Sequence, residues 1–322
     1  MGSANGRFRF GVQVLTYGAD WPDSLAAAQA VDRLGYDYLF GHDHLYSTGG
    51  NPYQPFFEGW TTIAAWAQAT TRVKIGLSVG NNTFRNPGVV AKMAATIDHI
   101  SGGRSILGLG AGNVELEAVA HGVTWASVGT RLDWFDESLS LIRAALAGET
   151  VTHDGPTYRF DAVHHSPLPI QQPLPVLIGA EGERKGLRFA AKHANYWQMF
   201  IGLDDVGGFR HKDEVFRGHC DDLGRDESEV ERMIGAKLVL RRDEREARRV
   251  AEALVAEHRW QDSIWDVFWA TTPERIADAL ARFREAGVGS FTPQLGWPFD
   301  LETLELLIGP VAERLGAAES VA

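Results

Sequence analysis

Short apolar runs alternate along the chain with longer segments in which apolar positions recur at helical spacing. The short runs are typical of buried strands, and the longer segments are typical of helices that cover a sheet. The expected strands occupy residues 8–14, 38–44, 73–79, 105–110, 176–180, 196–200, 233–240 and 290–294. The expected helices occupy residues 22–34, 60–69, 87–100, 131–146, 184–193, 213–223, 244–257 and 301–315. One more helix is expected at Pro273, directly after the capping residue Thr272.

Strands and helices alternate without a linker or a change in composition. This order predicts an α/β protein with a closed, parallel, eight-stranded (β/α)8 TIM barrel, formed by residues 1–322 as a single domain. Residues 150–174 interrupt the rhythm with a predicted hairpin around Gly155-Pro156, which we interpret as an insertion between units four and five. Residues 1–7 are expected to be disordered. In such barrels the active site lies where the strands end, at their carboxyl side.

The charge of the chain limits its partners. A formal net charge of −11 argues against nucleic acid or an anionic membrane as a partner, because both favour a basic surface. The chain contains no apolar run long enough to span a membrane, and the residues before Phe8 lack the apolar core of a signal peptide. We therefore expect a soluble, cytoplasmic protein. Its one cysteine, Cys220, has no thiol partner and is expected to be inert.

The first candidate for chemistry is Gly41-His42-Asp43-His44, at the end of the second strand. In a functional interpretation, His44 is a proton donor or acceptor and Asp43 accepts hydrogen bonds. These polar residues would otherwise only cap the strand end. A metal site is a third interpretation, because the two histidines share a strand face. The later strands, however, end without further metal ligands, so we expect no metal.

Two further segments follow strands three and four. Residues 77–87 contain small and amide residues, Ser78, Val79 and Asn81, that suit contact with a planar polar ring, and Arg85 suits an anion. A plain loop leading to a helix at Pro87 is the alternative. Residues 108–113 are rich in glycine, which lets a ligand approach the backbone at Ala111, Gly112 and Asn113. The spacing is not that of a dinucleotide-binding motif.

The fourth segment, residues 179–185, joins a strand to a helix. Free backbone amides at the helix start, together with Arg184 and Lys185, favour a phosphate site. Ordinary capping by Glu181 and Glu183 is the alternative, and both acids would oppose a phosphate.

The four segments together resemble the luciferase-like monooxygenase superfamily, especially its actinobacterial branch of coenzyme F420-dependent oxidoreductases. The resemblance is carried by residues 81–104, 108–117, 129–133 and 175–179 within a similarity that covers about residues 8–300. It implies a TIM barrel that binds a deazaflavin, coenzyme F420, at the carboxyl mouth of the strands. The alternative cofactor is the flavin FMN, because both cofactors carry a phosphate-terminated ribityl chain.

The resemblance assigns roles to individual positions. Asp43 and His44 match an Asp-His pair that faces the deazaflavin ring and takes part in proton transfer. The bond between Ser78 and Val79 lies where relatives have a non-prolyl cis peptide behind the ring. The remaining positions implied to contact the cofactor ring or its phosphate are Asn81, Ala111, Gly112, Gly179, Gly182 and Arg184.

Two positions depart from the family pattern. Asn113 stands where sugar-phosphate dehydrogenases of the family have a glutamate general base, and an amide does not accept a proton usefully near neutral pH. That dehydrogenase activity is therefore not expected, and Asn113 is expected only to contact the cofactor. Glu181 stands where relatives usually have glycine, which changes the expected phosphate contacts.

The resemblance implies an oxidoreductase that transfers a hydride between the deazaflavin and a small organic substrate that is apolar or aromatic. His44 would exchange the accompanying proton, and Asp43 would orient His44 or contact the ring. The aromatic residues expected to wall the substrate pocket are Tyr17, Trp21, Tyr46, Phe56, Trp125 and Trp297. The alternatives are an FMN-dependent monooxygenase that needs a partner reductase, and a non-catalytic barrel that binds a flavin. Analogy also implies a homodimer. Small residues of the helix at 89–100, Ala91, Ala94 and Ala95, would permit close packing between subunits, and burial against the barrel explains them equally well.

Overall fold

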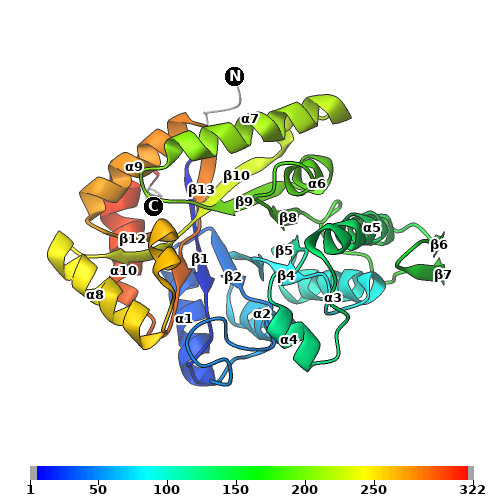
Figure 1. Cartoon of the computed structure of the whole chain (residues 1–322), viewed down its shortest axis with the longest axis horizontal. Coiled ribbons are helices and arrows are strands. Elements are labelled where there is room, and N and C mark those ends of the chain that lie inside the picture. Colours follow the sequence, from blue (N-terminus) through cyan, green and yellow to red (C-terminus); the bar gives the residue numbers. More distant parts are fainter. Residues whose placement is uncertain (1–5, 318–322) are drawn as a thin grey trace.

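The central feature of the protein, described for residues 6–317 in a computed structural model, is a closed parallel barrel (Figure 1). Strand β1 closes it by pairing with β2 on one side and with β13 and β14 on the other. The barrel strands are β1 (Arg9–Val14), β2 (Tyr38–Gly41), β3 (Lys74–Leu77) with β4 (Gly80–Asn81), β5 (Ser105–Gly110), β8 (Val176–Gly179), β9 (Tyr196–Phe200), β10 (Glu231–Gly235) with β11 (Lys237–Leu240), and β13 (Val288–Phe291) with β14 (Gln294–Leu295). This arrangement confirms the predicted (β/α)8 barrel.

Helices pack around the outside of the barrel. They are α1 (Trp21–Arg33), α2 (Gly59–Ala69), α3 (Pro87–Ile100), α5 (Val128–Leu146), α6 (Gly186–His193), α7 (Val206–Leu223), α9 (Pro273–Glu285) and α10 (Leu301–Leu306). The last continues through a π-helical turn, η3 (Leu307–Val311), into α11 (Ala312–Arg314), because Pro310 cannot donate an α-helical hydrogen bond. Helix α9 begins as predicted, with the side chain of Thr272 accepting a hydrogen bond from the backbone of Arg275.

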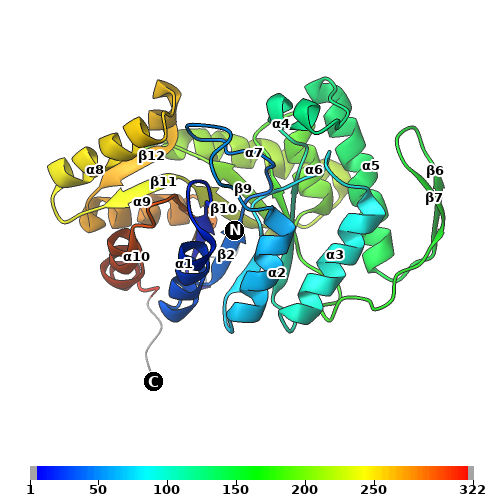
Figure 2. The same ribbon diagram turned by 90° about the horizontal axis from the view of Figure 1, so that it is seen from below.

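Several elements lie outside the barrel. The predicted hairpin forms from β6 (Val151–Asp154) and β7 (Arg159–Val163), which pair only with each other. At the opposite end of the molecule lie α8 (Glu244–Glu257) and β12 (Phe268–Thr271), as both views show (Figures 1 and 2). Strand β12 pairs with β11, and it was not predicted. The remaining short elements are α4 (Glu115–Ala120) and the 3₁₀ turns η1 (Glu227–Glu229) and η2 (Asp262–Val267).

Alternation along the strands divides the core into two layers. On β2, Tyr38 and Phe40 join a small buried cluster with Ile106, Leu177, Tyr196 and Met233 from other barrel strands. Leu39, between them in sequence, belongs instead to the large cluster shared with the helices. Successive strand residues point to opposite faces, so the small cluster fills the barrel and the large one seals the helices onto it.

The small residues of α3 pack inside the molecule. Ala91, Ala94 and Ala95 are buried in the chain's own core, which confirms the alternative of packing against the barrel. Residues 1–5 of the segment expected to be disordered lie outside the described residues, and Arg7 forms an ion pair with Asp37. Within residues 6–317, no helix is both long and apolar enough to cross a membrane.

Candidate functional site

A cavity of about 590 Å³ opens at the carboxyl ends of the barrel strands. Residues from the ends of β1, β2, β4, β5, β8, β9, β11 and β14 line it. All the predicted site residues line this cavity except Arg184: His44, Asp43, Ser78, Val79, Asn81, Ala111, Gly112, Asn113, Gly179 and Gly182. The cavity thus brings together residues from four segments that are far apart in the sequence.

His44 is held by a carboxylate that sequence analysis did not single out. Its Nδ1 lies 2.6 Å from Oε1 of Glu117, on α4, and the other oxygen of Glu117 accepts hydrogen bonds from the backbone amides of Leu45 (2.6 Å) and Tyr46 (3.2 Å). Burial alone would raise the pKa of Glu117, but these donors hold that pKa below its ordinary value. An ionised Glu117 needs the proton on Nδ1 of His44, which leaves Nε2 as the atom that exchanges a proton.

Asp43 has a different role from the one expected in relation to His44. Its carboxylate accepts hydrogen bonds from both terminal nitrogens of Arg85, at 2.7 and 3.0 Å, and from the backbone amide of Asn81 at 2.8 Å. Burial raises the pKa of Asp43, and the Arg85 guanidinium offsets part of that rise. The expectation that Asp43 orients His44 is therefore wrong, because Glu117 does so. The anion that Arg85 meets is Asp43, together with Glu58.

The backbone between Ser78 and Val79 is a cis peptide, as the resemblance implied. It interrupts the predicted strand at residues 73–79 and separates β3 from β4. Two glycines make room for the Val79 side chain: a Cβ on Gly110 would lie 2.7 Å from Val79 Cγ2, and one on Gly179 would lie 3.2 Å from Val79 Cγ1. The lack of side chains at these two strand-end glycines thus leaves room for the Val79 side chain in the cavity wall.

The loop after β5 approaches Asn81 closely. Gly112 has a φ of +81°, and a Cβ there would lie 2.6 Å from Oδ1 of Asn81. That oxygen accepts hydrogen bonds from the amide and the hydroxyl of Thr83. The Nδ2 of Asn81 is buried, lines the cavity region and has no partner among the described residues. It is thus a donor available to a bound ring, consistent with the expected contact.

The expected phosphate segment is only partly at the cavity. Helix α6 begins at Gly186, which lines the cavity, rather than at Arg184. Arg184 therefore lies in the preceding turn, where it is exposed and does not line the cavity. Lys185 forms an ion pair with Asp133 instead. Among the residues expected here, the glycines reach the site and the arginine does not.

The aromatic lining also differs from the expected set. The aromatic side chains that line the cavity are Phe135, Phe200 and Trp260. None of the expected residues lines the cavity itself, although Phe56 packs against His44, which does. Tyr17 contacts His258, Tyr46 contacts Tyr53 and His121, and Trp297 contacts Phe299. Trp21 likewise packs against Phe57, and Trp125 lies beneath the guanidinium of Arg131.

A row of polar residues inside the barrel was also missed. Lys237, Gln294 and Gln13 are neighbours in register across β11, β14 and β1, and all three line the cavity. The sequence signal was a polar residue within an otherwise apolar strand, at Gln13 and at Lys237. Among the described residues no cluster of His, Cys, Asp and Glu has the arrangement of a metal site.

Comparison with known proteins places this site in a family. The sequence profile of the luciferase-like monooxygenases matches residues 6–296. The chain therefore belongs to the luciferase-like monooxygenase family.

Curated relatives match only part of the chain. An uncharacterized protein of Mycobacterium bovis is 32% identical over 145 residues, which are 45% of this chain and 50% of that protein. An F420-dependent glucose-6-phosphate dehydrogenase of Intrasporangium calvum is 32% identical over 221 residues, which are 66% of this chain and 64% of that protein. The chain thus spans between about half and two thirds of the length of these relatives.

Solved structures share the fold over nearly the whole chain. An F420-dependent secondary alcohol dehydrogenase, in complex with an F420-acetone adduct, has a TM-score of 0.81 at 21% identity and is covered over 100% of its length by 98% of this chain. A long-chain alkane monooxygenase has a TM-score of 0.80 at 15% identity, over 98% of this chain and 93% of that one. At these identities the likeness shows the fold alone.

Proposed function

We propose that this chain is a coenzyme F420-dependent oxidoreductase that transfers a hydride between the deazaflavin and a small, apolar or aromatic organic substrate. The observation that carries the proposal is the combination of an apolar wall and an imidazole in one cavity. Val79 projects into the wall between Gly110 and Gly179, and His44, held by Glu117, lines the same cavity. An apolar surface for the ring and a proton-exchanging imidazole in one cavity suit a hydride transfer on a bound ring.

The residues present fit a tricyclic ring and its ribityl phosphate chain. The buried Nδ2 of Asn81 has no partner in the described chain and is free to donate to a ring oxygen or nitrogen. Glycines 110, 112, 179 and 182 line the cavity and have no side chains, so a ligand can lie directly against the backbone there. Gly182 and Gly186 line the part of the cavity nearest the start of α6, where a phosphate would meet backbone amides.

The bound deazaflavin would supply the hydride chemistry, and the protein residues would supply position and proton transfer. Glu117 fixes the tautomer of His44 with the proton on Nδ1, so that Nε2 is the atom that accepts a proton and gives it back. Asp43, neutralised by Arg85, fixes the backbone of Asn81 through its amide. The curated relative from Intrasporangium supports F420 over FMN, since it is named for F420.

Equilibrium titration of the purified protein with F420 and, separately, with FMN tests the proposal. We expect F420 to bind at least about tenfold more tightly than FMN, which corresponds to about 1.4 kcal/mol. The fluorescence of each cofactor on binding is the measurement. Tighter binding of FMN would replace the proposal with an FMN-dependent monooxygenase, and tight F420 binding without turnover of any substrate would favour a non-catalytic barrel.

A further inference from the structure

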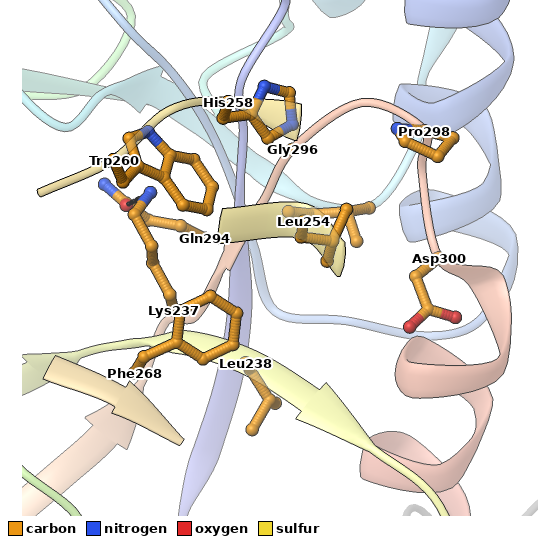
Figure 3. A pocket seen from close by; sticks show the side chains of 11 residues that line it. Lys237, Leu238, Leu254, His258, Trp260, Phe268, Gln294, Gly296, Pro298 and Asp300 are labelled. Atoms are coloured by element: carbon orange, nitrogen blue, oxygen red, sulfur yellow. Dashed lines mark hydrogen bonds between the residues drawn. The ribbon is translucent and has the colours of Figure 1, made fainter. Parts of the chain in front are cut away.

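Lys237 is a buried lysine inside the cavity that the proposed hydride transfer does not use. It is the first residue of β11, in register with Gln294 of β14, and its side chain lines the main cavity. It also lines a smaller adjoining cavity, where the side chain runs beside Phe268 toward Trp260 and the amide of Gln294 (Figure 3). Burial lowers the pKa of Lys237 to about 7.

The contacts of Lys237 contain no negative charge. Its Nζ donates to Oε1 of Gln294 at 2.9 Å and lies 3.9 Å from the ring centroid of Trp260. The amide of Gln294 donates in turn to Oε1 of Gln13 at 2.9 Å, and the amide of Gln13 donates to the carbonyl oxygen of Ser78. All donors in this row therefore point the same way, from Lys237 toward Ser78. The row uses only one of the three hydrogens on Nζ of Lys237.

The carboxylates near Lys237 already have other partners. Asp300, which lines the smaller cavity, accepts hydrogen bonds from Arg241 at 2.9 Å and from Thr303 at 2.7 Å. Asp43 lines the main cavity and is paired with Arg85, and Glu117, which lies behind the lining, is paired with His44. Glu181 is exposed and accepts a hydrogen bond from the amide of Phe200. Within residues 6–317, Lys237 thus has no ion-pair partner.

Two histidines face the same region from other elements. Burial lowers the pKa of His42, at the end of β2, well below its ordinary value and also lowers the pKa of His258, which follows α8. Neither histidine therefore competes with Lys237 as a cation near neutral pH. The amide nitrogen of Gln294 donates to Nε2 of His42 at 3.5 Å, so the proton of the neutral imidazole is on Nδ1. This Nδ1 is buried, has no partner in the described part of the chain and is a second donor at the same end of the cavity.

We propose that Lys237 is a substrate-binding residue that selects an apolar organic acid, whose carboxylate supplies the ion-pair partner that Lys237 lacks within the protein. A buried cation requires a compensating charge, and an ionised carboxylate also matches the free donors of Lys237 and His42. The apolar side chains of Phe200, Trp260 and Ile264 line the same cavity and suit the rest of such a molecule. The inference rests on the proposed function, because the acid is the second reactant beside the deazaflavin.

Calorimetric titration with trans-cinnamate and its neutral amide, cinnamamide, tests the inference on the protein with and without bound F420. We expect the wild-type protein to bind the acid at least about tenfold more tightly than the amide. Lys237→Met should remove this preference while leaving F420 affinity unchanged. Lys74→Met is the matched control, since Lys74 is exposed at the start of β3, the opposite end of the barrel, and the preference should persist in it.

The pH dependence in the wild-type protein is a second readout that requires no variant. Cinnamate stays ionised between about pH 6 and about pH 9, whereas unliganded Lys237 loses its proton above a pKa of about 7. Binding of the acid should therefore weaken at least about tenfold between these two pH values, and binding of the amide should not.

Three results would each overturn the inference: equal affinity for acid and amide, an undiminished preference in Lys237→Met, or acid affinity that is independent of pH. Failure of F420 to bind, with acid binding that still depends on Lys237, would instead overturn the proposed function and leave the acid site in place.

Discussion

Nδ1 of His44 donates to Oε1 of Glu117 across 2.6 Å, joining the end of β2 to α4. Glu117 is fully buried, and two backbone amides hold its second oxygen, so the orientation of the His44 ring is fixed from behind. A histidine supported by a buried carboxylate in this way keeps one tautomer and one ring position.

The first prediction concerns this support. Glu117→Gln should slow hydride transfer about 10- to 100-fold, because the neutral amide no longer stabilises the proton on Nδ1. F420 affinity should stay within about twofold, since Glu117 acts through His44 and does not line the cavity. Stopped-flow absorbance of F420 gives the rate, and its fluorescence gives the affinity. An unchanged rate would show that Glu117 does not assist proton exchange.

The second prediction concerns the ion pair between Asp43 and Arg85. Arg85→Ala should lower the free energy of unfolding by about 3–5 kcal/mol, because it leaves the buried carboxylate of Asp43 without its cation. The exposed pair of Arg159 and Asp154 is the matched control, and Arg159→Ala should cost less than about 1 kcal/mol. Urea unfolding measures both. Equal losses in the two variants would contradict the assigned role of Arg85.

The third prediction concerns the close approach of Gly112 to Asn81. Gly112→Ala should weaken F420 binding about tenfold and destabilise the fold by about 1–2 kcal/mol, because its φ of +81° is unfavourable with a Cβ that would lie 2.6 Å from Asn81 Oδ1. Gly218→Ala, on α7, is the control: a Cβ there meets nothing within 4 Å, and the helix should gain about 0.5–1 kcal/mol. Unaltered F420 binding by Gly112→Ala would exclude this loop from the cofactor site.

The fourth prediction concerns pH and the contact between α5 and α6. A hydrogen bond from His193, opposed by partial burial and reinforced by Lys192, lowers the pKa of Asp136 to about 2. The ionised carboxylate therefore stabilises the fold above about pH 4, and this contribution is lost as the pH falls from about 4 to about 2. Since the side chain is one third exposed, we expect Asp136→Asn to cost about 1 kcal/mol at neutral pH.

Urea unfolding at pH values of about 7 and about 3 measures this contribution. The difference between wild type and Asp136→Asn should shrink by about half at the lower pH. Asp222→Asn removes an exposed ion pair between Asp222 of α7 and Arg188 of α6, and it should change stability by less than about 0.5 kcal/mol at either pH. A difference that grows on acidification would contradict the account.

Local sequence signals were sufficient to predict the barrel. Period, capping residues and strand-ending glycines are encoded over a few neighbouring residues, so the eight units and the hairpin were found. Strand β12 was not, because its four residues follow a 3₁₀ turn and are stabilised by pairing with the distant β11. The start of α7 was placed too late, since the glycines at 207 and 208 conceal the helical pattern.

The site residues show the same difference between local signals and contacts over long sequence distances. Residues next to strand ends were predicted because a barrel brings all strand ends to one mouth. Glu117 was missed because its partner, His44, lies 73 positions earlier and no local pattern links them. The role of Asp43 was misjudged for a related reason: its partner Arg85 comes from another strand–helix unit. Contacts that cross between units depend on the packed structure rather than on neighbours in sequence.

A crystal structure of the protein with coenzyme F420 would test the central claim most directly. We predict that the deazaflavin ring lies against Val79 and Asn81, with His44 beside its reacting face and the phosphate near Gly182. Density for the deazaflavin ring outside this cavity would contradict the account, even with the contact between His44 and Glu117 intact.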